Sequence, residues 1–310
     1  YSACPFGYFV KHGLRAKEQE IWQIHKFEIG SLLHWAVCEY CREVEDGAES
    51  FAELSENWRT LSDEKSCEIV DKIMDDIAER VLRGLSDNRG KIEYLLVRMK
   101  KILMRSVDIV RLSLAKGEYA AVCYERQFEV DIEWNGKSIG LNGTIDRVDA
   151  SEDAEAGKIY LRIIDYKSGS KAFDVVSISN NTDMQLALYA VAATELYKKG
   201  ALGRADKGLT PAVSGILYNK LRDDMLVFAK RPPEDIAAQL RGKMKLDGLV
   251  VTDDDEAADV QRMDKCLAVP GTRSEFLRLA VNSKGTGLDK RLSSSVSRER
   301  FEILLKYVKK

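Results

Sequence analysis

Apolar side chains recur at helical spacing through the first third of the chain. The spacing predicts an amphipathic helix over residues 27–44 and further helical structure, without proline, from Phe51 to about Lys116. Ser62 is a suitable N-cap within this second stretch, and Asp87 to Gly90 interrupts the pattern before another long helix. We therefore expect a large N-terminal helical region.

After Gly117 the apolar positions alternate with polar ones, which is the pattern of strands. Asn135-Gly136 predicts a hairpin turn, and the acidic segment SEDAEAGK predicts a second turn before a strand over residues 160–167. The alternating positions ahead of the hairpin are Ala121, Cys123, Phe128, Val130 and Ile132.

The last third of the chain mixes both patterns. Residues 211–229 predict two strands around a polar turn, and Pro232-Pro233 predicts the start of a helix. Residues 269–295 have the weakest pattern, and we expect a loop or an interface there. A helical region followed by strands and helices indicates an α/β fold.

Candidate chemistry is concentrated where the strands are predicted. Asp165 and Lys167 would share one face of a strand, and Asp146 would end the strand before it. Two carboxylates brought together usually need a cation, and an acid beside an amine suits a metal site that faces a phosphate. Gln185 and Tyr189, one helical turn apart, could donate hydrogen bonds to a phosphate or to ordered water.

His34 lies on the predicted helix 27–44, one turn after Gly30. The missing side chain of Gly30 leaves room beside the imidazole, which could be a metal ligand or an ordinary half-buried residue. Cys38 and Cys41 share the helix face with His34, so a zinc site is an alternative. Since a structural zinc site needs four ligands and no partner motif follows, burial is the better explanation of both cysteines.

Four short motifs occur in a fixed order: G-x-x-x-H at Gly30 and His34, G-x-x-D ending at Asp146, D-Y-K at residues 165–167, and Q-x-x-x-Y from Gln185. Together they resemble the RecB-like branch of the PD-(D/E)XK nuclease superfamily. The resemblance implies a restriction-endonuclease-like core, which is a central mixed sheet flanked by helices. It also implies metal-dependent hydrolysis of phosphodiester bonds.

The resemblance implies a role for each matching residue. Catalysis would fall to Asp146, Asp165, Lys167, Gln185 and Tyr189. The ligands of Mg²⁺, with Mn²⁺ as a substitute, would be His34, Asp146, Asp165 and the carbonyl oxygen of Tyr166.

Glu125 is also similar to a glutamate found at this place in the family. It could belong to the outer shell of the site or be a surface residue of its strand.

The opening YSACPFGYFVKHGL resembles the start of the nuclease domain in the AddB family of helicase-nuclease subunits. In that family the matching cysteine, here Cys4, is the first ligand of a [4Fe-4S] cluster, and the other three ligands form a C-terminal cysteine group. Only Cys266 lies well downstream here, so we expect an excised fragment that cannot complete the cluster. Segments near both ends extend the likeness over essentially the whole chain.

The AddB resemblance implies a DNA exonuclease domain that resects double-strand breaks for recombinational repair, by cutting the strand that ends 5′. It would work with an AddA-type subunit. We expect residues 1–117 to form the helical part that carries Cys4 and His34. Residues 118–310 would form the nuclease core and C-terminal helices.

Two other classes of function stay open: a stand-alone Fe-S exonuclease on the same core, and a non-catalytic DNA-binding scaffold. The long helical segment from Phe51 argues against the first, because stand-alone enzymes of this kind are shorter. The presence of Asp146, Asp165 and Lys167 together argues against the second.

Composition narrows the setting. The net charge of −2 argues against a generally basic nucleic-acid binder, although local patches matter more. One local candidate is the long helix expected after Gly90, whose charges form either a solvated face or a stripe along a DNA path. Its basic residues are Arg98, Lys100, Lys101, Arg105 and Arg111.

The sequence also predicts what the chain lacks. It contains no apolar run of about eighteen residues, no signal-like start and no G-x-x-x-x-G-K-[ST] phosphate loop. The six cysteines are scattered without a disulfide-like framework. We therefore expect a cytoplasmic protein with no membrane contact and no ATPase motor of that kind within this segment.

Overall fold

The computed structural model describes residues 4–14, 26–82, 89–134, 137–180, 182–203, 208–222, 236–253 and 256–308. Its helices before the sheet match the predicted helical region. They are α1 (Pro5–Tyr8) with a short helical turn (Phe9–Gly13), α2 (Lys26–Val44), α3 (Phe51–Thr60), α4 (Asp63–Leu82) and α5 (Arg89–Ala115).

Local capping explains where these helices begin. Ser50 and Glu53 form a capping box at the start of α3. The Ser62 hydroxyl accepts a hydrogen bond from the Lys65 backbone N–H (3.1 Å) at the start of α4, as an N-cap should. The predicted break at 87–90 is partly wrong, because Gly90 lies in the first turn of α5, where backbone N–H groups need no helical partner. Residues 87–88 lie outside the described residues.

The described residues form one mixed sheet with strand order β1-β2-β3-β4-β5-β6, which confirms the predicted fold class. Strands β3 and β4 are parallel, as are β5 and β6, and the other neighbours are antiparallel. The strands are β1 (Ala120–Trp134), β2 (Lys137–Asp153), β3 (Lys158–Lys167), β4 (Thr210–Lys220), β5 (Asp247–Thr252) and β6 (Ser295–Ser297).

Several sequence expectations fall between these strands. Trp134 pairs with Lys137, so Asn135-Gly136 joins two paired strands, although both residues lie outside the described part. The second strand expected within 211–229 and the helix start at Pro232-Pro233 also fall largely on residues that are not described. The remaining helices are α6 (Val175–Ser179), α7 (Gln185–Lys198), α8 (Ile236–Met244), α9 (Glu256–Met263), a 3₁₀ turn (Lys265–Ala268) and α10 (Arg298–Val308).

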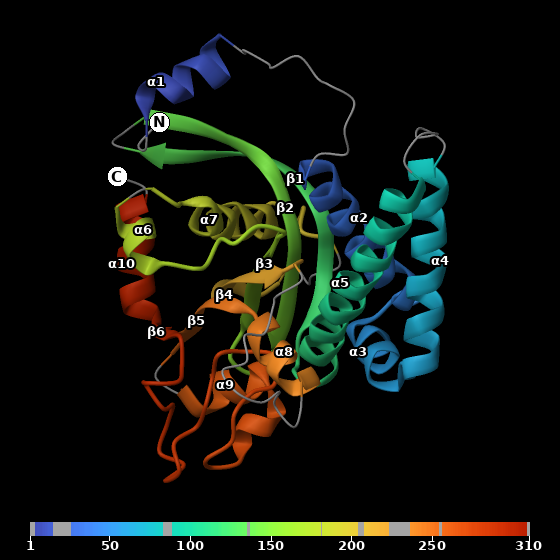
Figure 1. The fold of residues 1–310 in the computed structure, drawn as a ribbon. Helices are drawn as coiled ribbons and strands as arrows, with labels where there is room; N and C mark the ends of the chain where they lie inside the picture. The colour runs from blue at the N-terminus through green and yellow to red at the C-terminus, as the bar shows by residue number, and fades with distance from the viewer. Residues whose placement is uncertain are drawn as a thin grey trace, which may run out of the picture.

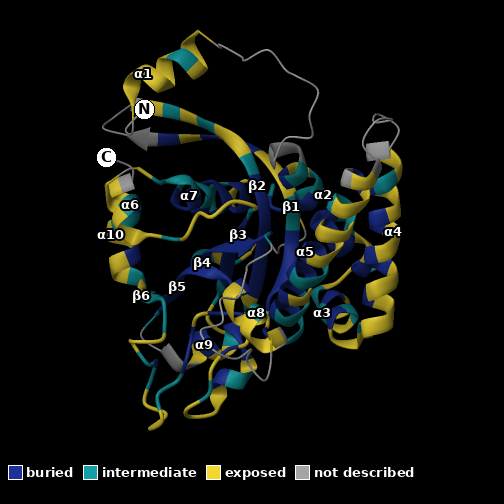
Figure 2. Cartoon of the chain, in the orientation of Figure 1, coloured by how far each residue is buried: buried dark blue, intermediate teal, exposed yellow. Residues whose placement is uncertain are grey.

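The sheet separates two layers of helices (Figure 1). Helices α2 to α5 pack on one face around a hydrophobic cluster, and α7 packs on the other face around a second cluster. Figure 2 shows the buried residues gathered along the strands and on the helix faces that meet them. The first cluster joins Leu114 of α5 to Tyr160 and Ile164 of β3, so helices and sheet share one core. The division of the chain near residue 117 stays a prediction.

Strand directions bring several ends to one edge of the sheet. The parallel β3 and β4 both end there, at Lys167 and Lys220, and the antiparallel β5 begins there, at Asp247. Strand β6, parallel to β5, begins on the same side. We call this edge the site edge.

A buried ionic network lies behind the site edge. Arg147, Asp149 and Arg162 are each completely buried. The Asp149 carboxylate lies 2.8 Å from Arg147 Nε and 2.7 Å from Arg162 Nη2. Arg162 also donates to the Ser113 carbonyl of α5 and stacks on the ring of Tyr119. The network therefore ties α5 to β2 and β3.

Residues 269–294 have no long element, as the weak pattern predicted. They are nonetheless packed, because Phe276 and Leu279 are buried and short bridges join Leu246 to Leu277 and Arg273 to Ala280. None of the described helices combines the length and the apolar character needed to span a bilayer.

Candidate active site

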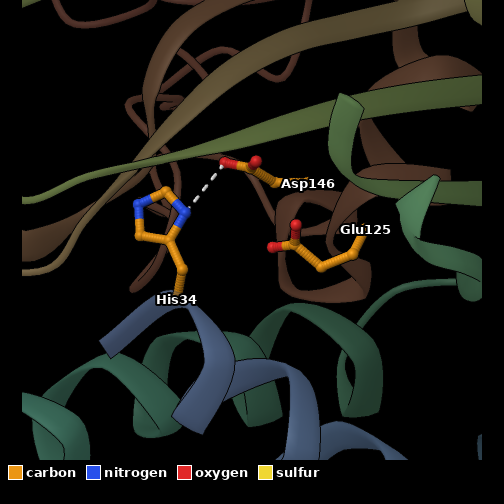
Figure 3. A group of neighbouring side chains, drawn as sticks. All are labelled: His34, Glu125 and Asp146. Carbon is orange, nitrogen blue, oxygen red and sulfur yellow. Dashed lines mark ion pairs between the residues drawn. The ribbon is translucent and has the colours of Figure 1, made fainter. Parts of the chain in front are cut away.

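Helix α2 carries His34 to the site edge. A side chain at Gly30 would place its Cβ 2.8 Å from the Ser168 hydroxyl, so glycine allows α2 to approach the end of β3 closely. His34 Nδ1 then lies 3.6 Å from Asp146 Oδ2 (Figure 3). The G-x-x-x-H spacing thus places an imidazole over the strand ends from the opposite face to α7.

The two predicted aspartates lie on neighbouring strands. Arg147 pairs with Ile164, so the same register sets Asp146 opposite Asp165. Asp146 accepts a hydrogen bond from the Tyr166 backbone N–H (2.7 Å), and Asp165 lies 2.6 Å from the Lys167 ammonium. Both acids are buried, with 8% and 1% of their surface exposed.

Glu125 completes the acidic group, in a place that sequence reasoning left open. Tyr124 pairs with Arg147 and Arg126 with Ile145, so Glu125 lies across from Asp146. Ligand atoms of His34, Glu125 and Asp146 all lie within 4.8 Å of one another, and Figure 3 shows the three side chains turned toward a common space. Asp165 is not in this group of three.

The backbone of Glu125 is strained. Its φ of +45° is the left-handed conformation that non-glycine residues rarely adopt, at a cost of about 1–3 kcal/mol. Such strain commonly occurs at functional sites, since it aims a side chain that regular geometry would send elsewhere.

A chain of polar contacts links the lysine to helix α7. Lys167 Nζ donates to Gln185 Oε1 (2.7 Å), and Gln185 Nε2 donates to the Tyr189 hydroxyl (3.0 Å). The Lys167 ammonium also lies 5.2 Å from the centre of the Tyr218 ring. Since Gln185 begins α7, its side chain and that of Tyr189 reach the site from the second face of the sheet.

Burial and like charges set the protonation of the acids. Burial, and next the charge of the neighbouring Asp165, raise the pKa of Asp146 to about 8. Burial also raises the pKa values of Asp165 and Glu125, although Lys167 opposes the shift at Asp165. Three crowded carboxyl groups therefore cannot all ionise near neutral pH without added positive charge.

The imidazole is held neutral. Burial, and next the charge of Lys167, lower the pKa of His34 to about 4, although a hydrogen bond with the backbone of Tyr166 opposes this shift. A neutral imidazole has a lone pair available for a metal ion. Carboxylate oxygens around one neutral imidazole fit a divalent cation such as Mg²⁺ or Mn²⁺.

Cation affinity should rise with pH. Because the folded pKa of Asp146 lies near 8, a cation binding below that pH must displace a proton, and affinity should fall about tenfold per pH unit. Without cation the sign for stability is opposite: the raised pKa contributes stability that is present at low pH and is lost as pH rises through about 8. Calorimetric titration with Mn²⁺ in buffers of different ionisation enthalpy measures both affinity and proton release. In Asp146→Asn the pH dependence should disappear; its persistence there would assign the proton elsewhere.

The cysteines lie apart from this group. Cys38 and Cys41 are buried, and burial raises the pKa of Cys38 to about 12 and that of Cys41 further. Neither belongs to a metal-binding group in the described part of the chain, which favours packing over zinc. Cys4 is an exposed N-cap of α1 whose sulfur accepts from the Gly7 N–H, and Cys266 is half-buried.

The basic face of α5 is largely engaged with α4. Lys100 forms an ion pair with Asp71, and Arg111 forms one with Asp63. These contacts favour the solvated-face interpretation of the stripe over a DNA path.

Comparison with known proteins identifies the family. Residues 1–278 match the family model of the PD-(D/E)XK nuclease superfamily. The chain belongs to this superfamily. The match confirms the family predicted from the four motifs and the assignment to nuclease enzymes, which generally use divalent metal ions.

The similar curated proteins are much longer than this chain. It is 30% identical over 318 aligned positions to the ATP-dependent helicase/deoxyribonuclease subunit of the AddB type from Alkaliphilus metalliredigens. The same identity holds for the proteins of that name from Caldanaerobacter subterraneus subsp. tengcongensis and Clostridium perfringens. Each alignment covers 99–100% of this chain but 26% of the relative, so the chain spans about a quarter of their length.

Proposed function

We propose that this chain is a Mg²⁺-dependent DNA exonuclease domain of a helicase-nuclease that resects double-strand breaks. The observation that carries the proposal is the convergence of His34, Glu125 and Asp146, within 4.8 Å, beside the Asp165–Lys167 pair. The names of the similar proteins supply the helicase and deoxyribonuclease setting. From the family resemblance we further propose that the strand ending 5′ is cut and that an AddA-type subunit is the partner.

The acids and the imidazole would hold the cation. Asp146, Asp165 and Glu125 offer carboxylate oxygens, His34 offers a ring nitrogen, and Tyr166 offers its backbone carbonyl. When bound, the cation polarises the scissile phosphate and lowers the pKa of a bound water. The Tyr166 N–H fixes the Asp146 carboxylate, so this ligand is oriented before the cation arrives.

Lys167, Gln185 and Tyr189 would act on the phosphate. The Lys167 ammonium, held between Asp165 and Gln185, can orient the attacking water or offset charge that develops on the phosphate oxygens. Gln185 positions Lys167 and is itself held by Tyr189, whose hydroxyl can donate to a phosphate oxygen. With DNA as its substrate, the protein would work beside the chromosome in the cytoplasm.

The described residues do not complete an iron–sulfur cluster. Cys4 is exposed and belongs to no metal-binding group among them, so a [4Fe-4S] cluster would need ligands from outside this chain. The proposed chemistry uses no step that depends on it.

A nuclease assay tests the proposal. Single-stranded and double-stranded DNA labelled at either end should be degraded only with Mg²⁺ or Mn²⁺, and the label that is released reports the polarity. Asp146→Asn should bind DNA but leave it intact, because the cation loses a central ligand. If the unaltered chain binds DNA yet never cuts it with either metal, the non-catalytic scaffold is the correct interpretation.

A further inference from the structure

A cavity of about 320 Å³ with a cationic lining lies outside the group of acids. We call it the loop pocket, because residues 269–294, the loop at the bottom of Figure 1, form most of it. Among the described residues its lining contains four cationic side chains and no carboxylate. The polar residues that line it are Lys245, Arg273, Arg278, Arg291, Ser293 and Ser294.

The loop pocket opens on the site edge. Leu246, just before β5, donates its backbone N–H to Phe276 (2.8 Å), and Ser294, just before β6, donates to Arg278 (2.9 Å). These contacts fix the loop beside the starts of β5 and β6, on the same edge as the ends of β3 and β4.

One acid links the loop pocket to the candidate active site. Asp247 lies 3.3 Å from Arg278 Nε and 3.4 Å from Lys220 Nζ. Lys220 is the register partner of Lys167, and Asp247 is the register partner of Tyr218, over which the Lys167 ammonium sits. A row of side chains across three strands thus runs from the catalytic lysine to the pocket.

The charge of the loop pocket is not balanced from within. In the part of the chain that the structure describes, the guanidinium groups of Arg273 and Arg291 have no acidic partner. Lys245 is half-buried, and its ammonium donates to the Ser274 carbonyl, which leaves further donor capacity. Burial, and next the charge of Arg273, lower the pKa of Lys245, as expected where cations are crowded. An anion in the cavity would relieve this repulsion.

We propose that the loop pocket binds the phosphodiester backbone of the DNA strand next to the bond that is cut. The forked donors of arginine match phosphate oxygens in a bidentate geometry, which favours a phosphate over a carboxylate-bearing peptide beside this site. The proposal rests on the proposed function, because it assigns the pocket to the substrate of the same nuclease. The pocket would hold the strand in place while Lys167 faces the scissile phosphate.

A binding experiment without divalent metal isolates the pocket from catalysis. The double variant Arg273→Gln, Arg291→Gln removes two exposed charges, so its melting temperature should be unchanged. Affinity for a fluorescent single-stranded oligothymidylate, measured by anisotropy, should fall about tenfold at low salt. The slope of log affinity against log salt should shrink by about 1.4, at ~0.7 for each lost phosphate contact.

The matched control removes two exposed charges elsewhere. Arg59→Gln, Lys65→Gln lies on α3 and α4 and alters net charge equally, yet it should leave affinity and salt slope as in the unaltered chain. Equal affinities for the unaltered chain and the pocket variant, an equal loss in the control, or no DNA binding by the unaltered chain would overturn the proposal. So would tighter binding of polyaspartate than of DNA at matched ionic strength, with the loss confined to the pocket variant.

Cleavage kinetics separate the pocket from the proposed function. With Mg²⁺ the pocket variant should show a raised KM and an unchanged kcat on a long oligonucleotide, and normal cleavage of a dinucleotide too short to reach the pocket. A lowered kcat on the dinucleotide would contradict the assignment. Failure of the unaltered chain to cut either substrate would refute the nuclease proposal alone, because the metal-free comparison does not depend on cleavage.

Discussion

Replacing Lys167 by alanine is expected to slow phosphodiester cleavage by about a thousandfold, the usual cost of losing one donor that stabilises transition-state charge. The ammonium sits between Asp165 (2.6 Å) and Gln185 (2.7 Å), at the end of the strand that carries the acids. Single-turnover rates at saturating Mg²⁺ measure the effect without a contribution from cation affinity. The variant should still fold, because the Lys167 side chain is at the edge of the sheet and packs into neither hydrophobic cluster.

A second measurement reports the same lysine without catalysis. The charge of Lys167 helps to lower the pKa of His34, so the imidazole of Lys167→Ala should titrate at higher pH in a metal-free NMR experiment. Lys198→Ala, an exposed lysine on α7, serves as the control and should change neither quantity. A Lys167→Ala protein that cuts at the unaltered rate would remove this residue from the mechanism.

The motifs predicted the candidate site better than the secondary-structure pattern did, because residue spacing carries geometry. Gly30 and His34 one turn apart predicted a close helix approach, and the structure supplies the reason in the contact with Ser168. The D-Y-K alternation predicted that Asp165 and Lys167 face the same way, and they form an ion pair. The catalytic and metal-binding roles of these residues stay predictions.

Glu125 was left undecided although the sequence contained a signal for it. A two-residue hairpin at Asn135-Gly136 pairs Trp134 with Lys137, and counting back along both strands sets Glu125 opposite Asp146. The missing information was the positive φ, since alternation alone does not predict that a non-glycine residue adopts the left-handed conformation. Tertiary packing determines that conformation.

The charged residues behind the site were not predicted to be buried. Arg147, Asp149 and Arg162 follow the strand alternation, but isolated charges usually indicate an exposed face. Only the joint placement of all three around one carboxylate makes burial tolerable, and that placement depends on the β2–β3 register. The loop pocket escaped prediction for a similar reason, because residues 269–294 are held by short bridges that leave no periodic pattern.

Replacing Asp149 by alanine is expected to cost about 3–5 kcal/mol in the free energy of unfolding, because it leaves two buried guanidinium groups without their counter-charge. Both Arg147 and Arg162 are fully buried and contact the same carboxylate, so neither can turn to solvent without opening the packing of α5 on the sheet. Urea denaturation followed by circular dichroism measures the loss. Asp71→Ala, which breaks an exposed ion pair with Lys100, is the matched control and should cost far less.

A triple replacement shows whether charge or shape is responsible. Changing Arg147 and Arg162 to methionine together with Asp149→Leu removes all the buried charge while it keeps most of the volume, so much of the lost stability should return. If Asp149→Ala proves no more harmful than Asp71→Ala, the network does not hold the strands in place. If instead the triple variant is stable but cleaves slowly, the network's contribution is to the geometry of Asp146 and Tyr166, the neighbours of Arg147 in sequence and in space.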